Sequence, residues 1–542
     1  MRHIATFVFF AVVAAIFFGS IGGWDLWDPD EPRYAQVARE MIETGSYALP
    51  HINGEIYPDK PPLFFWMIAA ASFPFGDVNA FSARFPPVFF GFCLILLTYF
   101  FTRKIFDPLT ALLAAVILFS TEGFFKTSLS VHFDSILAFF TTASLFCFYC
   151  GYTDKKNRVY FLLSWLFMGL AVSTKGPVGL AVPLVSIVTF LLCRKDFKTL
   201  KRFSVVTGLF IVAGIVACWL LPACISGGED YTNNILLKQT FGRLVKSYSH
   251  QKPFYYYIYK FPFHIIPWSL FVPGACYYFW KQRREIPEIR FPLVWFAAPF
   301  IFLSMVSGKR GLYLLPLYPA SAMLMAKFWR DHICLEVKGD SARHQKLFML
   351  PAILIFCIFI LAGIGINIAS LFKTVLSDMP QSSQILLLSA GGLICFIGIL
   401  GMVMLYSRFR LRALFSLVSV TMIVLSAVGV FVVYPYANTS KSAKFFAQRI
   451  NTIVKPENNL IASFNPVLFN YYLHRYPIRR IEADNALLEM LVSDERIYLL
   501  VKEKEYLRAS ENLKSRVMIL DRAKIKKTTY YLLVNREANN SG

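Results

Sequence analysis

Long apolar segments follow one another along most of the chain and restrict its fold more than any other feature. A segment of about 20 apolar residues can cross a bilayer, and it crosses as a helix because lipid offers the backbone no hydrogen-bond partners. Of the 542 residues, 56% are hydrophobic, whereas soluble domains have about 45–50%. We therefore predict an all-α, multi-pass membrane domain over residues 1–434. The thirteen predicted spans are 4–22, 82–101, 108–122, 131–151, 158–174, 177–193, 204–223, 262–280, 290–307, 311–328, 347–371, 384–407 and 411–434.

Lysine and arginine are concentrated in short segments between these spans. With the N-terminus in the cytoplasm, every inner loop carries at least two of them, and the outer loops are very short or mixed in charge. This distribution follows the positive-inside rule. The net charge of +22 is then explained by anionic lipid, and nucleic acid is excluded as a partner. The loops 23–81 and 224–261 lie on the outer face, which in a bacterium is the periplasm. The basic inner loops are 102–104, 154–158, 193–202, 281–290, 330–346 and 408–412.

Residues 435–542 have the pattern of a small α/β domain on the same outer face. Four runs in it are typical of strands: "NLIASF", "RIYLLVKE", "RVMILD" and "TTYYLLVN". Two further runs, Val467–His474 and Ala486–Val492, predict helices. No motif in this tail indicates a particular chemistry.

The first outer loop begins with four acidic residues crowded behind the first span. Asp30 can cap a helix with Pro32 in its first turn. The next apolar residues recur at helical spacing, which predicts an interfacial helix lying on the membrane. Capping and interaction with the helix dipole explain one or two of the acids, but four are poorly explained in this way. The acids are Asp25, Asp28, Asp30 and Glu31, and the apolar stripe is Tyr34, Val37, Ala38 and Met41.

Further along this loop, Lys60 precedes two prolines and an apolar run, Leu63–Phe75, that is too short to span the membrane. We predict a second interfacial helix over this run. A lysine held at the surface in this way can bind a phosphate as a point charge. It can equally extend its ammonium group to water from an apolar base.

Other outer segments carry charges beside apolar runs. Asp134 begins a span, where a carboxylate facing lipid costs about 2.5–3.5 kcal/mol, so it is either a functional residue or a helix cap. Lys175 lies in a tight turn that a helix connection alone would also explain. Two more basic and aromatic groups occur at Arg243, His250 and Lys252, and at Lys309, Arg310 and Tyr313.

These charges gather on the outer face, and the centres of the predicted spans are nearly uncharged. A transporter or flippase would need polar residues at the middle of the membrane. A surface site for an anionic, lipid-anchored substrate therefore fits the sequence better.

Several motifs in these segments resemble one family. "DEPRYAQVAREM" followed by "NGEIYPDKPPLFFW" is similar to the first periplasmic loop of bacterial lipid A aminoarabinose transferases. These enzymes are relatives of the dolichyl-phosphate-mannose protein mannosyltransferases. "TKGPVGL", "HQKPFYYY" and "GKRGLYLLPLYPA" resemble later motifs of the same family. The resemblance covers residues 20 to about 325.

The resemblance implies the GT-C fold, with about 13 transmembrane helices and a small periplasmic C-terminal domain. It also implies an inverting glycosyltransferase of the bacterial inner membrane that moves a sugar from undecaprenyl phosphate to lipid A. The sugar would be 4-amino-4-deoxy-L-arabinose or a related one. A protein O-mannosyltransferase-like or other glycan transferase is the alternative, and a lipid-linked sugar flippase is the non-enzyme alternative.

The resemblance assigns roles to residues at matching positions. Asp30 and Asp134 match catalytic aspartates, and Lys60 matches the lysine that holds the carrier phosphate. Asp59 and His250 match residues that can share a divalent metal such as zinc. Asp59 is shorter than the glutamate usual at its position, which weakens the match to a metal site. The resemblance therefore implies no required cofactor and allows a divalent metal such as zinc at Asp59 and His250. Weaker matches to phosphate binding are Arg243, Lys309, Arg310 and Tyr313, and Glu31, Arg33, Tyr34 and Lys175 support the motifs.

Overall fold

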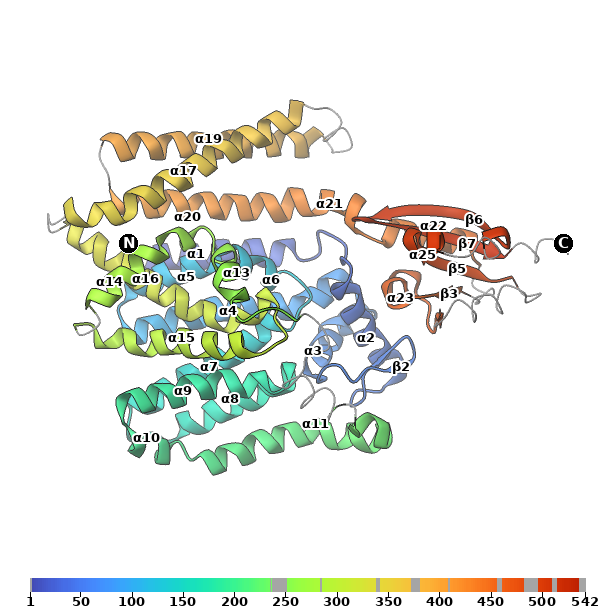
Figure 1. The fold of residues 1–542 in the computed structure, drawn as a ribbon, viewed down its shortest axis with the longest axis horizontal. Helices are drawn as coiled ribbons and strands as arrows, with labels where there is room; N and C mark the ends of the chain where they lie inside the picture. The colour runs from blue at the N-terminus through green and yellow to red at the C-terminus, as the bar shows by residue number, and fades with distance from the viewer. Residues whose placement is uncertain are drawn as a thin grey trace. The chain divides into compact units, whose positions relative to one another are not determined.

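The apolar runs of the sequence form helices in the computed structural model of the chain (Figure 1). The residues grouped by their contacts form two units. Unit 1 consists of Met1–Ile21, Pro58–Phe64 and Arg84–Val433, and unit 2 consists of Gly22–Tyr57, Phe65–Ala83 and Tyr434–Gly542. The residues described by the structure are 2–233, 235, 251–282, 285–337, 342–371, 381–407, 410–455, 461–481, 496–508 and 514–535.

Unit 1 is helical throughout its described part. Its α-helices are α1 (Arg2–Ser20), α4 (Ala80–Ile105), α5 (Pro108–Phe119), α6 (Glu122–Ser128), α7 (Asp134–Thr153), α8 (Val159–Lys175), α9 (Val178–Arg194), α10 (Phe197–Arg202), α11 (Val205–Asn233), α13 (Tyr256–His264), α14 (Val272–Gln282), α15 (Arg290–Met305), α16 (Tyr318–Val337), α17 (Ala342–Leu371), α19 (Gln381–Ser407) and α20 (Leu411–Val428). Shorter turns are the 3-10 segments η3 (Trp268–Phe271), η4 (Pro287–Ile289) and η5 (Gly311–Leu317), and the π-helical segment η6 (Gly429–Val433).

The described residues contain eight helices long and apolar enough to cross a membrane, or nine if one bent pair is a single span. The chain is therefore a multi-pass membrane protein, but the predicted thirteen spans exceed this number. Some predicted spans are short, since α8 and α9 have 17 residues each. Others are interrupted. The predicted span 108–122 bends by 68° between α5 and α6, and 262–280 is divided among α13, η3 and α14 around Pro267, because proline cannot donate a helical hydrogen bond.

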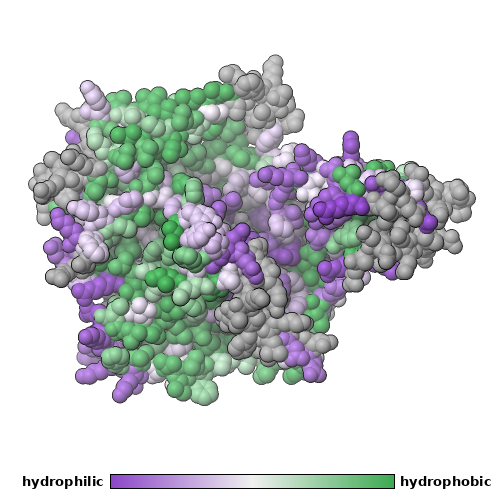
Figure 2. All heavy atoms as spheres, viewed as in Figure 1, coloured by the Kyte–Doolittle hydropathy of each residue, from purple (hydrophilic) through white to green (hydrophobic). Residues whose placement is uncertain are grey.

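The helices of unit 1 show the surface expected in lipid. In Figure 2, hydrophobic residues cover the outward flanks of α11, α17 and α19. On α11, Phe210 and Ile225 are more than 70% exposed, which a protein in water would avoid but a bilayer accepts.

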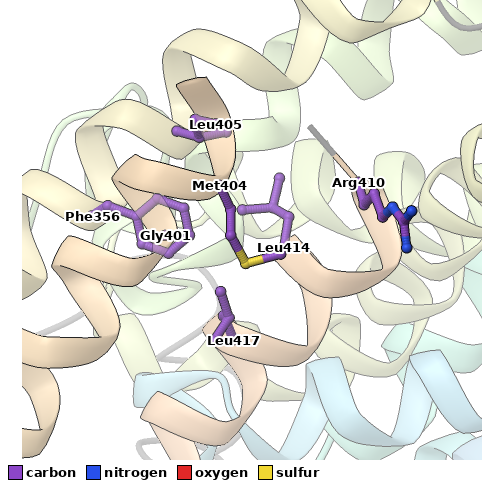
Figure 3. Close-up of a pocket in the computed structure, with 7 residues that line it drawn as sticks. All are labelled: Phe356, Gly401, Met404, Leu405, Arg410, Leu414 and Leu417. Atoms are coloured by element: carbon purple, nitrogen blue, oxygen red, sulfur yellow. The ribbon is translucent and has the colours of Figure 1, made fainter. Parts of the chain in front are cut away.

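Close packing joins α17 to α19 through glycine. A side-chain carbon added at Gly401 would lie 2.4 Å from the Phe356 ring, so only glycine allows this approach, as is common between membrane helices. A small cavity of about 10 Å³ remains beside this contact and reaches Arg410 and Leu414 (Figure 3). It has room for about one water molecule and is too small for a substrate.

Unit 2 combines most of the first loop with the tail. From the loop come α2 (Asp30–Thr44), the hairpin β1 (His51–Ile52) and β2 (Glu55–Ile56), most of α3 (Leu63–Ser72), which begins in unit 1, and η1 (Phe73–Phe75). From the tail come α21 (Tyr434–Lys441), α22 (Lys444–Ile453), β3 (Ile461–Ser463), α23 (Val467–Leu473), β4 (Arg479–Arg480), β5 (Tyr498–Lys502), α25 (Glu503–Arg508), β6 (Val517–Ile525) and β7 (Thr528–Asn535).

The tail forms a mixed five-stranded sheet in the order β4-β3-β5-β7-β6. Its strand β3 runs parallel to β4 and β5, and β7 runs antiparallel to β5 and β6. The four predicted strands and the helix after Pro466 are confirmed, whereas the predicted helix Ala486–Val492 lies outside the described residues. The sequence reading missed α22, whose Phe446 and Ile450 pack into the core of the sheet.

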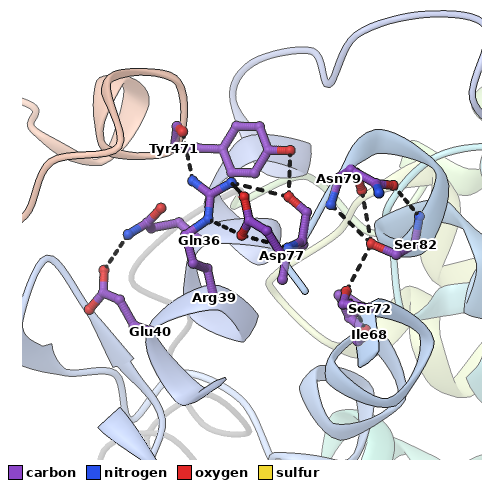
Figure 4. A network of polar contacts seen from close by, with 10 residues as sticks. Gln36, Arg39, Glu40, Ile68, Ser72, Asp77, Asn79, Ser82 and Tyr471 are labelled. Carbon is purple, nitrogen blue, oxygen red and sulfur yellow. Dashed lines mark hydrogen bonds and ion pairs between the residues drawn. The ribbon is translucent and has the colours of Figure 1, made fainter. Parts of the chain in front are cut away.

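Helix α2 is held in unit 2 by a buried arginine. The Arg39 guanidinium forms two hydrogen bonds to the Asp77 carboxylate, at 2.8 and 2.9 Å, and donates to the Tyr471 and Val78 carbonyls (Figure 4). It also lies 4.4 Å from the centre of the Tyr471 ring. Because Arg39 is only 4% exposed, these bonds compensate for its desolvation. They join the first loop to the tail.

We expect Arg39→Leu to loosen unit 2, because it leaves the Asp77 carboxylate and two carbonyls without their donor. The Asp77 side chain is 47% exposed and stays solvated, so the cost comes mainly from the two carbonyls, at about 1–3 kcal/mol. This corresponds to amide exchange about 5- to 150-fold faster in α2 and α23. Hydrogen–deuterium exchange of the full chain in detergent measures this. The matched control is Arg449→Leu, which removes a half-exposed pair with Asp521 worth about 0–1 kcal/mol. Equal exchange in the two variants would contradict the role of Arg39.

Candidate active site

A buried ion pair lies at the start of α7. Asp134 is its first residue and is fully buried. Its Oδ1 accepts a hydrogen bond from the ammonium group of Lys175, the last residue of α8. Helices α7 and α8 pack against each other, which brings these two residues together although they are 41 positions apart. The second carboxylate oxygen, Oδ2, is buried and has no hydrogen-bond partner among the described residues.

Aromatic rings surround the cationic side of this pair. The Lys175 ammonium lies 4.1 Å from the centre of the Tyr313 ring and 5.1 Å from that of Phe133. The Lys60 ammonium lies 5.5 Å from the same Phe133 ring, and Phe64 packs edge-on against it at 5.9 Å. Such contacts stabilise a desolvated ammonium group. Phe133 therefore holds two of the predicted cations, Lys60 and Lys175, beside Asp134.

Lys309 and Arg310, neighbours in sequence, are in different situations. Lys309 is 3% exposed, and its ammonium donates to the carbonyls of Lys252 and Val306. Burial lowers the pKa of Lys309. Its role in the structure is to tie the segment before η5 to residue 252. Arg310 is half-buried and close enough to Lys175 for their charges to repel, so it belongs to the cluster around Asp134.

This cluster in unit 1, made of Asp134, Lys175, Lys60, Arg310 and Tyr313, has more positive than negative charge. Such a surplus attracts an anion, and in a site shielded from water the attraction is stronger than in solution. The Oδ2 atom of Asp134, which has no hydrogen bond among the described residues, can accept a hydrogen bond or a proton. The cluster can therefore bind a phosphate and place a carboxylate beside it.

In unit 2, Asp30 and Arg33 form a second charged pair. Asp30 is 8% exposed and accepts a hydrogen bond from Arg33. The Arg33 guanidinium also donates to the Tyr34 hydroxyl at 3.3 Å and lies 5.0 Å from the centre of its ring. The Glu31 carboxylate accepts from the Trp27 amide at 2.8 Å. The four motif residues thus interact with one another or with the turn just before them.

Two predictions about α2 are wrong. Asp30 is not the helix cap, because Pro29 occupies that position without a side-chain bond and Asp30 lies in the first turn. The helix also does not leave a polar face in water, as an interfacial helix would. The predicted apolar stripe is buried, but so are Gln36, Arg39 and Glu40, because unit 2 supplies partners for them.

Asp25 and Asp28 have partners within unit 2 as well. The Asp25 amide donates to Asn438 at 3.0 Å, and its carboxylate is 3.4 Å from the Lys444 ammonium. The Asp28 carbonyl accepts from Lys526. Burial raises the pKa of Asp28, and the charge of Lys526 partly offsets that effect. Both residues fasten the first loop to the tail within unit 2.

The predicted metal site is not tested, because His250 lies outside the described residues. Arg243, which was predicted to bind the carrier phosphate, lies outside them as well. Within the described part of the chain, no group of three or more histidine, cysteine, aspartate or glutamate residues could hold a metal ion. Asp59 has other interactions. We build no step on a metal.

The sequence reading missed Phe133. It is one of 54 phenylalanines, and its only sequence signal is its position directly before Asp134. Tyr257, whose hydroxyl donates to the Arg310 carbonyl at 3.4 Å, has no sequence signal that separates it from the tyrosines beside it.

Comparisons with known proteins agree with these features. Residues 3–234 match the family model for dolichyl-phosphate-mannose-protein mannosyltransferase. A protein of Aquifex aeolicus, described as uncharacterized, is 30% identical over 366 residues, which are 67% of this chain and 70% of that protein. The chain belongs to the dolichyl-phosphate-mannose-protein mannosyltransferase family. A family relative in Proteus mirabilis, named undecaprenyl phosphate-alpha-4-amino-4-deoxy-L-arabinose arabinosyl transferase 2, is 34% identical over 314 residues.

That alignment spans 56% of this chain and 56% of the Proteus relative, so it covers little more than half of either protein. The fold likeness is broader. The crystal structure of ArnT from Cupriavidus metallidurans, bound to undecaprenyl phosphate, has a TM-score of 0.78 to this chain and covers 97% of both. At 19% sequence identity, this likeness shows the fold and confirms the predicted GT-C architecture of this family member.

The ion pair in this family member gives a test of stability that needs no substrate. We expect Asp134→Leu or Lys175→Met to destabilise unit 1 by about 3–5 kcal/mol, because each leaves a buried charge without its partner. The double variant removes both charges and should recover most of that loss. Thermal unfolding of the purified protein in detergent measures the effect. A double variant no more stable than the worse single variant would show that the pair is not what stabilises this position.

Proposed function

We propose that the protein is an inverting glycosyltransferase that moves a sugar, 4-amino-4-deoxy-L-arabinose or a close relative, from undecaprenyl phosphate to lipid A. One observation carries the proposal. The buried carboxylate of Asp134 has one oxygen without a hydrogen bond among the described residues, and it lies beside the cations Lys175 and Lys60. The name of the Proteus relative supports the choice of sugar and carrier.

In the proposed reaction, the bond between the sugar's anomeric carbon and the carrier phosphate oxygen breaks. A bond from the acceptor oxygen to the opposite face of that carbon forms. Both electrons of the broken bond stay on the phosphate, which gains negative charge. Lys60 and Arg310 would stabilise that charge, and charge-assisted hydrogen bonds to phosphate are strong.

The two predicted catalytic carboxylates have different surroundings. Asp134 shares its Oδ1 with Lys175 and keeps Oδ2 open. A hydroxyl acceptor must lose a proton, and we propose that Asp134 takes it as a general base. A lipid A phosphate is already ionised and needs no base. In that case Asp30 or Asp134 would orient the amino group of the sugar or stabilise positive charge at its anomeric carbon.

We propose that the site and the tail face the periplasm from the bacterial inner membrane. The distribution of lysine and arginine over the predicted loops supports this orientation. The tail and most of the first loop would then share the compartment in which a lipid-linked donor and a glycolipid acceptor can meet.

Lys60→Gln tests the proposed donor site. We expect kcat/KM for the undecaprenyl-phosphate sugar to fall by about 10- to 100-fold, because one charge-assisted bond to phosphate is worth about 1.5–3 kcal/mol. Asp30→Asn and Asp134→Asn should lower kcat more, by about 100-fold or beyond. Transfer is measured with the full chain in vesicles. The matched control is Lys126→Gln on α6, an exposed lysine of the same unit. Wild-type transfer rates in folded Lys60→Gln and Asp134→Asn variants would refute the assignment.

The acceptor is tested in cells. If lipid A is the acceptor, mass spectrometry of lipid A from cells with the gene should show a species heavier by one amino sugar. That species should disappear in cells producing only the Asp134→Asn variant. Unchanged lipid A together with newly glycosylated protein or another glycan would instead support the alternative acceptors.

A further inference from the structure

A groove of about 1120 Å³ lies within unit 2, and its described lining includes none of the residues assigned above to catalysis and donor binding. One side is formed by the β1–β2 turn, and the other by α22, α23 and the segment leading into β4. Its charged lining residues are mostly basic. Among the described residues they are Arg475, Arg479 and Arg480, with Glu55 as the acid; His474 also lines the groove.

The groove has a well-defined framework. Asn53, at the tip of the hairpin, is 6% exposed, and its side chain bonds to both backbone groups of Ile478. Its Oδ1 accepts from the Ile478 amide at 2.7 Å, and its Nδ2 donates to the Ile478 carbonyl at 3.0 Å. Asn53 and Gly54 have positive φ, as a two-residue hairpin turn requires. The two sides of the groove are thus joined at Ile478.

Glu40 fixes the turn from beneath. Its carboxylate accepts from the Asn53 amide at 2.7 Å and from the Gly54 amide at 2.9 Å. Glu40 is fully buried, and its carboxylate is stabilised by these two donors and by the Gln36 side-chain amide. Arg475 is anchored on the other side, where it donates to the Val454 carbonyl at 2.6 Å.

Two arginines remain exposed along the groove. Arg479 and Arg480 form the edge strand β4, and both are exposed. Arginine binds phosphate through two parallel hydrogen bonds. An extended peptide could also pair with an edge strand, but β4 has only two residues and offers little backbone for pairing. The apolar residues Ile461, Leu473 and Ile478 and the tyrosine Tyr476 also line the groove, and such a lining suits the face of a sugar.

We propose that this groove binds the phosphorylated sugar headgroup of the acceptor glycolipid. Its volume of about 1120 Å³ slightly exceeds the range for small-molecule sites, about 300–1,000 Å³, so it has room for more than a single phosphate. The inference rests on the proposed function, because it names where the acceptor of that reaction is recognised. It assigns acceptor binding to Arg479 and Arg480, and donor binding stays with the cluster around Asp134.

The test compares the double variant Arg479→Gln/Arg480→Gln with Lys524→Gln/Lys527→Gln. The control removes the same charge from exposed residues on β6 and in the turn after it, and β6 is the opposite edge strand of the sheet. In vesicles containing the donor, the arginine variant should raise KM for lipid A by about 10- to 100-fold. Its kcat and its KM for the donor should stay within about twofold of wild type. An unchanged KM for lipid A, or an equal rise in the control, would overturn the proposal.

A binding experiment separates failure of this inference from failure of the proposed function, because it needs no turnover. The full chain in detergent is titrated with a bis-phosphorylated glucosamine disaccharide, with the same disaccharide lacking phosphate, and with inorganic phosphate. We expect the first to bind at least 10-fold more tightly than the others, and the arginine variant to lose that preference. Equal binding of inorganic phosphate would mean a simple anion site. If the arginine variant lost binding to phosphatidylglycerol vesicles as much as it lost binding to the phosphorylated disaccharide, the groove would be a membrane contact. Either result would overturn the headgroup assignment.

Discussion

The ion pair between Asp134 and Lys175 is the constraint on which the arrangement of unit 1 depends. Neither charge could be buried among apolar helices alone, because desolvation of a single ion costs more than packing around it returns. The pair therefore requires the start of α7 and the end of α8 to meet at one level. That meeting also brings the Phe133 ring close to the ammonium groups of both Lys175 and Lys60. A requirement of stability thus gathers the groups that the proposed chemistry needs.

In unit 2, buried charges are also compensated by partners, but the partners are different. The motif "DEPRYAQVAREM" divides into two halves. Its second half, with Arg39 and Glu40, is fully occupied by bonds to Asp77, to Asn53 and to the tail. In its first half, Asp30 and Arg33 pair with each other at the N-terminal end of α2. The second half therefore fixes the helix that carries the first. Motif residues can thus matter to function without touching a substrate.

Sequence patterns predicted the helical membrane domain and the strands of the tail, because hydrophobic period and length are local properties. They also identified Asp134, Lys175 and Lys60, since charges beside apolar runs are costly and stand out. They did not predict that the Lys309 ammonium would donate to two backbone carbonyls, because that depends on its tertiary surroundings. The burial of the polar face of α2 was not predicted for the same reason. Its partners, Asp77 and Tyr471, are 38 and 432 residues from Arg39.

The charge balance around Asp134 bears on how the proposed site would work. Lys175 binds one carboxylate oxygen of Asp134, and Lys60 and Arg310 bring two further positive charges to the cluster. A bound phosphate would compensate for these charges, so donor binding would stabilise the cluster. After the sugar leaves, the carrier phosphate has more negative charge than before and is held more strongly. Stabilisation that grows along the reaction in this way lowers the barrier, and it also opposes release of the carrier. The number of arginine and lysine side chains that can usefully surround such a site is therefore limited. Lys309 donates to two backbone carbonyls instead of adding another cation to it.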